Sequence, residues 1–385
     1  MNILFTTLRQ PSHFLPLIPF LEACRSRGHD VAVAAPADFA DRVAATGATF
    51  FPFGHPGDEA LRPLWMRLRG APEEEIKRIS VGEIFAGACA GAALPGLLET
   101  MGRWRPSIVV RESQEYAALL AAQKLGIPQV RVAISAPSAE TEIFQHAAAP
   151  IDVHGQAQGL PPDPSAERLA RETALTLFPA SLEAPAGAPA SVFRFRADRK
   201  AAPPLPDWWG ARQGPFVYVT LGTVVGGFDV MRSAFRTMLD ALVGLPIRAL
   251  LTIGAELPIE ALGEVPQNVH VERFVPQDEV IPHADVVVCH GGSGTVLGAL
   301  AAGVPLVVAP MFADQPFNAQ RIAAVGAGLA LPTRDVSVAA LRQALSRVLE
   351  GRAFRQSARR IADEIAVLPS MDDAAVQIER LGQRA

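Results

Sequence analysis

A glycine-rich turn interrupts an apolar stretch in the second half of the chain, which reads "VVVCHGGSGTVLGAL" from Val286 to Leu300. The apolar run stops at His290, and small residues follow before apolar residues resume: Gly292, Ser293, Gly294 and Thr295. Glycine lets a backbone approach a ligand closely, and the N–H groups at the start of a helix attract an anion. This pattern indicates the binding of a phosphate or diphosphate.

Three interpretations of this turn involve a ligand. A dinucleotide fingerprint, G-x-G-x-x-G, would need its last glycine one residue before Gly298, and a Walker A loop would need a lysine after the glycines. The third is a strand followed by a helix whose N-terminal N–H groups receive a diphosphate, stabilised by up to ~2 kcal/mol from the helix dipole. A tight turn that needs small residues for packing alone is the alternative without a ligand.

Other polar residues stand where strands are expected to end. Asp314, Gln315 and Asn318 follow the next apolar run, about twenty residues after Gly294. In the first half, "PSHFLP" places His13 just after the first apolar run. A histidine titrates near neutral pH and suits proton transfer, although a structural histidine at a helix start explains the same pattern.

Short β-branched runs alternate with Ala/Leu-rich helical stretches, a pattern typical of βαβ units and parallel sheets. In the first half a helix is expected over Pro16–Arg27. The expected strands are Asn2–Leu8, Asp30–Ala35, Ser107–Arg111 and Gln129–Ala133 in the first half, and Phe216–Leu221, Ala249–Ile253, Val269–Val271, Val286–Cys289, Leu306–Ala309 and Leu329–Leu331 in the second.

A Pro-rich segment separates two halves that each begin with a strand, a turn and an amphipathic helix. We therefore expect one Rossmann-like domain over residues 1–198, a linker over 199–215 and a second Rossmann-like domain over 216–369. A last helix over 370–385 could pack back on the N-terminal domain. Paired Rossmann-like domains of this kind bind ligands in the cleft that they face, at the carboxyl ends of their strands.

Composition narrows the class of protein. A chain of 385 residues is too long for one ordinary core, so two domains are expected. A net charge of -4 gives no basic surface for nucleic acid. Three widely spaced cysteines, Cys24, Cys89 and Cys289, argue against a disulfide framework and for a reducing cytoplasm. No uninterrupted apolar stretch appears long enough to span a bilayer, so stable membrane insertion is not expected.

The motifs around the turn resemble one family closely. "RFVPQ", "HGGSGT", "AAGVP" and "ADQ", all between Arg273 and Arg321, are similar to the donor-binding signature of family 1 glycosyltransferases of the GT-B fold. The best resemblance is to actinobacterial enzymes that glycosylate polyketide, enediyne or similar natural products. It implies an α/β GT-B fold, with two Rossmann-like parallel-sheet domains facing a cleft. The resemblance also implies that the N-terminal domain, residues 1–198, binds the acceptor and that the C-terminal domain, residues 216–369, binds the donor.

The resemblance assigns roles in donor binding. His290 matches the histidine that contacts the donor phosphate, and residues 292–295 match the turn that offers N–H and hydroxyl groups to the diphosphate. The other matches are Phe274, Val275 and Gln277 for the segment on the nucleobase, Asp314 and Gln315 for the pair on the sugar hydroxyls, and Thr223 for a phosphate-contacting residue in the first loop of the second domain.

The resemblance also assigns the catalytic pair. His13 matches the family's catalytic base, and a base histidine usually has a carboxylate on its other nitrogen. "SIVVRESQEY" offers Glu112 at the matching place, where the family usually has Asp, and Glu115 three residues further on. No D-x-D motif or metal-ligand spacing occurs, so we expect a metal-independent enzyme with no cofactor besides its nucleotide-sugar cosubstrate.

The resemblance implies an inverting transferase that moves an activated, deoxy sugar from a nucleoside diphosphate to a hydroxyl of a hydrophobic natural product. Plant members that use UDP-sugars have a Glu for the ribose hydroxyls where this chain has Gly298, so dTDP, which lacks the 2′-hydroxyl, is expected. Phe85, Leu94, Ile143 and Phe144 could line an acceptor pocket or belong to an ordinary core.

Other functions fit the same fold. A non-hydrolysing nucleotide-sugar 2-epimerase, a NAD-linked oxidoreductase and a non-catalytic accessory protein that binds a sugar nucleotide are the alternatives. The sequence does not decide the sugar, the acceptor or the oligomeric state, a homodimer included.

Overall fold

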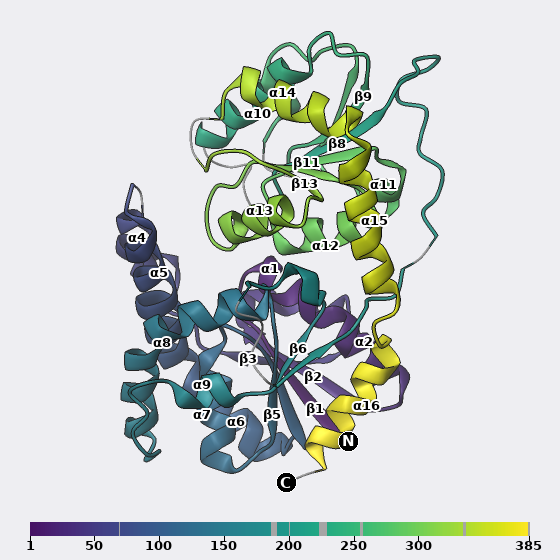
Figure 1. The fold of residues 1–385 in the computed structure, drawn as a ribbon. Helices are drawn as coiled ribbons and strands as arrows, with labels where there is room; N and C mark the ends of the chain where they lie inside the picture. Colours follow the sequence, from purple (N-terminus) through teal and green to yellow (C-terminus); the bar gives the residue numbers. More distant parts are fainter. Residues whose placement is uncertain are drawn as a thin grey trace. The chain divides into compact units, whose positions relative to one another are not determined.

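The computed structural model describes residues 1–68, 70–185, 191–199, 201–222, 229–254, 257–333 and 336–383. The chain divides into two compact units. Unit 1 comprises Met1–Phe178, Glu183–Asp198 and Leu368–Ala385, and unit 2 comprises Pro179–Leu182 and Arg199–Val367. Each unit is a parallel sheet with helices on both faces (Figure 1).

Unit 1 has a seven-stranded sheet in the order β3-β2-β1-β4-β5-β6-β7, and every pair is parallel. Its strands are β1 (Asn2–Thr6), β2 (Asp30–Pro36), β3 (Thr49–Phe53), β4 (Ile108–Glu112), β5 (Gln129–Val132), β6 (Ala174–Thr176) and β7 (Val192–Arg194). Its helices are α1 (Pro11–Phe14), η1 (Leu15–Leu17), α2 (Ile18–Ser26), η2 (Ala37–Phe39), α3 (Ala40–Ala44), α4 (Asp58–Arg67), α5 (Glu73–Lys77), the π-helix η3 (Arg78–Cys89), α6 (Ala90–Trp104), α7 (Tyr116–Leu125), α8 (Pro137–Ala157), α9 (Glu167–Arg171) and α16 (Met371–Gly382).

Unit 2 has a six-stranded parallel sheet in the order β10-β9-β8-β11-β12-β13. Its strands are β8 (Phe216–Thr220), β9 (Arg248–Thr252), β10 (Val269–Glu272), β11 (Val286–Cys289), β12 (Leu306–Val308) and β13 (Gly328–Ala330). Its helices are η4 (Ala180–Leu182), α10 (Asp229–Leu242), η5 (Ile259–Leu262), α11 (Gln277–Val280), η6 (Ile281–His283), α12 (Ser293–Ala301), α13 (Gln315–Ala324), α14 (Val338–Glu350) and α15 (Arg352–Ala366).

The strands of unit 1 are apolar on both faces because helices cover both. Leu4 joins the core cluster formed with η3, α6, α7 and α8, whereas its neighbours Ile3 and Phe5 join the cluster formed with α2 and α16. Alternate side chains of β1 therefore enter two separate cores, and Figure 1 shows these two sets of helices on opposite faces of the sheet.

The ten strands expected from the sequence are all present; β11 has the expected ends, and the other nine have ends shifted by one or two residues. Three further strands, β3, β6 and β7, were not expected. β3 is an edge strand that carries Pro52, and proline weakens the strand signal, whereas β6 and β7 are only three residues long.

The Pro-rich segment before β8 contains no helix or strand among its described residues. Trp208 and Trp209 pack onto unit 2: Trp208 stacks on His270 with ring centroids 5.0 Å apart, and Trp209 contacts Phe216 at 5.4 Å. The last helix, α16, lies in unit 1, where it packs on α2, and Glu379 on α16 pairs with Arg27 at 2.7 Å.

One helical stretch of unit 1 is long and apolar, although Glu83 interrupts its apolar run. Residues Glu73–Trp104 form 32 continuous helical residues that meet the length and composition for a membrane span. Within its most apolar window, however, 56% is buried inside the structure, where η3 packs on α8 and α6 packs on α7. More than half of this apolar window is thus buried in the core of unit 1.

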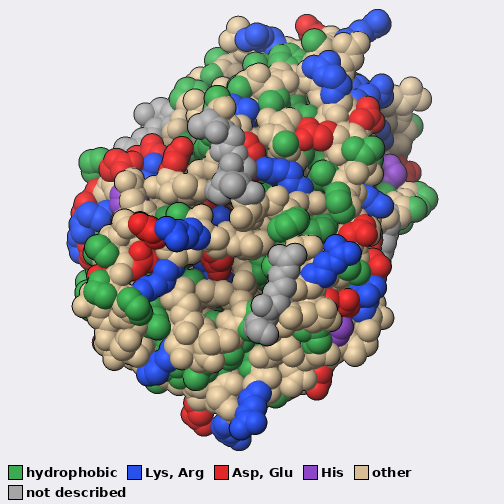
Figure 2. Space-filling model, turned by 60° about the horizontal axis from the view of Figure 1, so that its bottom comes forward, with side chains coloured by type: hydrophobic (Ala, Val, Ile, Leu, Met, Phe, Trp, Pro, Cys, Tyr) green, Lys and Arg blue, Asp and Glu red, His purple; other side chains and the backbone are tan. Residues whose placement is uncertain are grey.

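Charged side chains of both signs are mixed on the face shown in Figure 2, and neither sign forms one continuous patch there. This distribution agrees with 35 basic and 39 acidic residues in the chain.

All three cysteines are free and buried, and burial raises the pKa of each thiol to about 12. Because the thiolate is the reactive form, we expect labelling by a disulfide reagent at pH 8 to be slower than at a free thiol by about 10³-fold or more. Absorbance during labelling with Ellman's reagent measures this rate. The exposed variant Ser165→Cys is the control and should add one fast equivalent; fast labelling of the native chain would contradict the expectation.

Candidate active site

His13 and Glu112 meet at the carboxyl edge of the unit 1 sheet. His13 lies in α1 directly after β1, and Glu112 is the last residue of β4, the neighbour of β1. His13 Nδ1 lies 3.0 Å from Glu112 Oε1, and the exposed fractions of the two residues are 9% and 0%. A carboxylate accepts, so Nδ1 is the donor of this hydrogen bond, and in the neutral imidazole Nε2 then has the free lone pair. The structure thus brings the two predicted catalytic residues together.

The surroundings fix this pair. Glu112 Oε2 accepts the backbone N–H of Gln114 at 2.7 Å, and the edge of the His13 ring meets Phe85 with ring centroids 5.6 Å apart. A histidine held in one tautomer with a free Nε2 can act as a general base.

Glu115, the other carboxylate near His13 in the sequence, has a different position. Its side chain caps α7 by accepting the N–H groups of Ala117 and Ala118, and it accepts the hydroxyl of Thr6 at 2.8 Å. Burial raises the pKa of Glu115 to about 7, the charge of Glu112 acts in the same direction, and the bond from Thr6 opposes it. Of the two glutamates, Glu112 is the one hydrogen-bonded to His13.

In unit 2 the glycine turn holds the ring of His290. Gly291 has φ +92°, and a β-carbon there would lie 2.7 Å from Val308. A β-carbon at Gly292 would lie 2.5 Å from His290 Nε2, and one at Gly222 would lie 3.0 Å from His290 Cε1. The ring therefore sits between two backbone segments that only glycine permits.

Burial lowers the pKa of His290 to about 4, against a smaller opposite effect of the Thr220 backbone. At neutral pH the imidazole is therefore uncharged and can donate one N–H to an anion without carrying a full charge.

The helix α12 begins at the predicted anion-binding turn, with Gly292 as its N-cap residue. Its first intrahelical bond runs from the Val296 N–H to the Gly292 carbonyl, so the three preceding N–H groups have no partner within the helix. The two hydroxyls are already used: Ser293 Oγ donates to Asp314 Oδ2 at 2.5 Å, and Thr295 Oγ1 donates to Gln277 at 2.9 Å. The backbone, more than the hydroxyls, is therefore available to an anion.

Asp314 and Gln315 lie at the start of α13, next to this turn. Asn318 joins them by donating to the Gly291 carbonyl at 2.9 Å and to Asp314 Oδ2 at 3.0 Å. Gln315 is only 4% exposed, and its Oε1 accepts the backbone N–H of Met311 and of Phe312. The role predicted for Gln315 on sugar hydroxyls would thus fall to its amide nitrogen.

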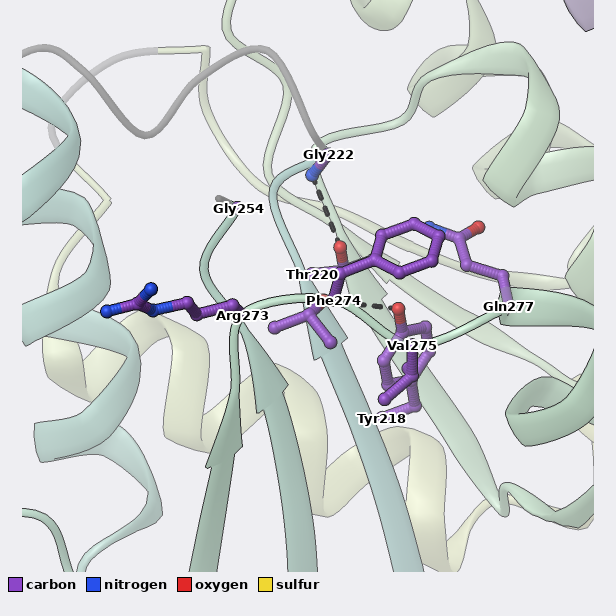
Figure 3. Close-up of a pocket in the computed structure, with 9 residues that line it drawn as sticks. Tyr218, Thr220, Gly222, Gly254, Arg273, Phe274, Val275 and Gln277 are labelled. Carbon is purple, nitrogen blue, oxygen red and sulfur yellow. Dashed lines mark hydrogen bonds between the residues drawn. The ribbon is translucent and has the colours of Figure 1, made fainter. Parts of the chain in front are cut away.

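A pocket at the carboxyl ends of β8, β9 and β10 contains the three residues predicted to contact a base, and Figure 3 shows them around it. Tyr218 and Thr252 line the pocket and are joined by a 3.1 Å hydrogen bond between their hydroxyls. The Arg273 side chain points away from Tyr218 (Figure 3). The full lining is Tyr218, Thr220, Gly222, Thr252, Gly254, Arg273, Phe274, Val275 and Gln277.

Sequence reasoning missed Tyr218 and Thr252 in this pocket. Thr252 is the last residue of β9, and this position is a signal that could have found it, because neighbouring parallel strands end at one edge. Tyr218 lies in the middle of β8, and its strand position gives no such signal. The predicted residue Thr223 lies outside the described residues.

The suggested acceptor residues belong mostly to the core. Leu94 and Phe144 are 3% and 4% exposed within the apolar cluster of unit 1, and Ile143 packs against that cluster. Phe85 belongs to the same cluster but also reaches His13 and the half-exposed Trp65. Within the described ranges, no group of three or more His, Cys, Asp or Glu side chains is arranged to hold a metal ion.

Comparison with known proteins defines the class. Residues 236–381 match the family model of the erythromycin biosynthesis protein CIII-like C-terminal domain. The chain is 31% identical over 381 residues to the L-demethylnoviosyl transferase of Streptomyces niveus, covering 96% of this chain and 95% of that protein.

Two solved structures share the fold. The glycosyltransferase SnogD from Streptomyces nogalater aligns with a TM-score of 0.77 and 26% identity, covering 99% of each chain. The glycosyltransferase VinC in complex with DTDP aligns with a TM-score of 0.80 and 24% identity, covering 100% of each chain. The predicted GT-B fold is confirmed.

The chain belongs to the family of actinobacterial antibiotic glycosyltransferases, and its residues 236–381 match the C-terminal domain of the erythromycin biosynthesis protein CIII-like type. It is a glycosyltransferase that uses a nucleotide sugar, as the sequence predicted.

The raised pKa of Glu115 predicts a pH-dependent stability. The folded carboxyl holds its proton up to about pH 7, but the unfolded one only up to about pH 4.5, so the stabilising contribution is complete below pH 4.5 and lost above pH 7. The free energy of unfolding of the wild type minus that of Glu115→Gln should fall by roughly 3 kcal/mol over this range. Urea denaturation at a series of pH values measures the difference.

The matched control is Glu22→Gln, which changes an exposed carboxyl on α2. A constant difference between Glu115→Gln and the wild type across the pH range would show that Glu115 does not titrate as described.

Proposed function

We propose that this enzyme is an inverting transferase that moves a deoxy sugar from dTDP to a hydroxyl of a hydrophobic natural product, with His13 as general base. The observation that carries this proposal is the buried 3.0 Å contact between His13 Nδ1 and Glu112, which leaves Nε2 as the proton acceptor.

The reaction follows from the two groups of residues. The acceptor hydroxyl gives its proton to His13 Nε2 while its oxygen attacks the anomeric carbon of the donor sugar. The bond from that carbon to the diphosphate oxygen breaks, and the electron pair leaves with the diphosphate. Glu112 stabilises the imidazolium that forms on His13.

The leaving diphosphate would be stabilised at the start of α12. The N–H groups of residues 293–295, the helix dipole and the neutral imidazole of His290 supply donors that are fixed before the reaction. Preorganised donors of this kind stabilise developing negative charge without reorganisation.

The choice of dTDP is supported by the absence of a side chain at Gly298. The VinC structure was determined with DTDP, and this chain has the same fold. A site without a partner for a 2′-hydroxyl gains nothing from binding one.

The hydrogen bonds that Gln315 already makes support a deoxy sugar as the transferred group. Its Oε1 already accepts two backbone N–H groups, so the site offers fewer acceptors to sugar hydroxyls than the two predicted residues suggest. The Streptomyces niveus enzyme that this chain resembles is named for transferring an L-demethylnoviosyl group. The apolar acceptor is supported by Phe85, which contacts His13, and by the half-exposed Trp65, which contacts Phe85.

Substitution of the dyad tests the mechanism. His13→Gln should lower kcat by about 10²- to 10⁴-fold and leave the Kd for dTDP unchanged, because the base acts on the acceptor and the nucleotide binds in unit 2. Mass spectrometry of transfer from dTDP-sugars to a panel of aglycones measures kcat, and calorimetry measures the Kd.

His29→Gln is the matched control, since His29 precedes β2 at the amino edge of the same sheet and pairs with Glu379. Full activity in His13→Gln would exclude His13 as the base. Release of an epimerised nucleotide sugar in place of a glycoside would exclude the transferase itself.

Gly298 gives a second test, using UDP and dUDP, which differ only in the 2′-hydroxyl. The wild type should bind both within about twofold, whereas Gly298→Glu should favour UDP by about tenfold through a charge-assisted hydrogen bond. A β-carbon at this position lies 3.4 Å from Ile281 Cδ1, an ordinary contact, so the substitution is expected to fold. Gly298→Ala is the control without a carboxylate. A strong preference of the wild type for UDP over dUDP would contradict the proposed donor.

A further inference from the structure

Unit 1 buries more charge beside the dyad than the proposed reaction uses. Arg111 and Arg131 are 0% and 1% exposed, and they are the largest fully buried side chains in the described parts of the chain. Four glutamates lie around the same ends of β4 and β5, each 8% exposed or less: Glu112, Glu115, Glu140 and Glu172. Burying ion pairs costs desolvation, so stability alone explains such a cluster poorly.

Arg111 faces two ways. On one side its guanidinium pairs with Glu172 through two bonds, one of them Nε to Oε1 at 2.9 Å. On the other side Nη1 donates to three backbone carbonyls, those of Glu112 at 3.1 Å, Ser113 at 2.8 Å and Glu115 at 3.4 Å. These carbonyls belong to the turn that joins β4 to α7.

That turn determines where the Glu112 carboxylate lies. One of its oxygens contacts His13, and the other accepts the N–H of Gln114, which is part of the turn. A shift of the turn would therefore move the carboxylate away from the imidazole. Glu has one more side-chain torsion than the Asp usual at this place, so its position depends more on such contacts.

The other charges hold the far side of the same turn. Ser113 Oγ donates to Glu140 at 2.7 Å, and Glu140 pairs with Arg131. Arg131 Nε in turn lies 3.8 Å from Glu172, the anchor of Arg111. Thr6, at the end of the strand that leads to His13, donates to Glu115. The cluster thus connects the strand before His13 with the turn after Glu112.

We propose that Arg111, anchored by Glu172, is a positioning residue for the dyad: it clamps the turn of residues 112–115 so that Glu112 stays on His13 Nδ1. Arg111 acts through Glu112 and touches no substrate. The inference rests on the proposed role of the dyad in sugar transfer.

A double-mutant cycle separates this role from a structural one. Arg111→Met should lower kcat by about 10- to 100-fold, because small misplacements of catalytic groups cost this much, with little change in the Kd for dTDP. In a Glu112→Gln background the same substitution should cost less than about threefold, since the carboxylate it positions is gone. Arg111→Lys keeps the positive charge but not the planar guanidinium with its several donors, so its kcat should lie between those of Arg111→Met and the wild type.

Arg194→Met is the matched control, because Arg194 pairs with the buried Glu183 at 2.8 Å and donates to the Phe178 carbonyl in the same unit, without a contact to the turn. It should lower stability and leave kcat unchanged. Equal losses for Arg111→Met in both backgrounds, or a loss matched by Arg194→Met, would overturn the proposal. If Arg111→Met does not fold, Arg111→Lys and Glu172→Gln replace it in the double-mutant cycle with Glu112→Gln.

Proton NMR of protein labelled with ¹⁵N-histidine gives a readout that needs no activity. The wild type should show a strongly deshielded His13 Nδ1–H bonded to Glu112, which Arg194→Met keeps and Arg111→Met shifts or loses. If the wild type shows this signal but transfers no sugar, the result would count against the proposed function but not against the positioning role of Arg111. An Nδ1–H signal that is unchanged in Arg111→Met would count against the clamp alone.

Discussion

Both candidate sites depend on the order of parallel strands. In each sheet the unit's first strand lies between its second strand and its fourth strand. The connection after the first strand and the connection after the fourth strand therefore run in opposite directions from these two neighbouring strands. A crevice opens at the carboxyl ends of such a pair because no connection covers it. His13 follows β1 and Glu112 ends β4 in unit 1, and Gly222 follows β8 and His290 follows β11 in unit 2.

The two units place different chemical groups at this position. In unit 1 the groups are a histidine and buried carboxylates, arranged so that a proton can be held at a defined nitrogen. In unit 2 the donors are backbone N–H groups and an imidazole whose pKa burial lowers to about 4. A proton acceptor needs charge partners, whereas an anion-binding site built from neutral dipoles avoids the cost of burying cations.

Departures from the family pattern have local compensation. In the first loop Gln10 and Pro11 precede His13, and Pro11 takes the first position of α1, which its fixed φ favours. Glu112 in place of Asp is longer, and the structure meets this with the bond from Gln114 and with the Arg111 contacts to the turn. Thr295 and Gln277 join the glycine turn to the base pocket through one hydrogen bond.

The sequence by itself determined the two parallel sheets, the central strands and the glycine turn, because periodicity and turn chemistry are local properties of the chain. It did not reveal the edge strands β3 and β7, whose pairing partners are supplied by the folded sheet. Only the tertiary structure decided that Glu112 rather than Glu115 meets His13, and that Arg111 contacts the turn beside it. Partners 99 residues apart, as His13 and Glu112 are, are chosen by strand order and side-chain direction, which chain spacing does not encode.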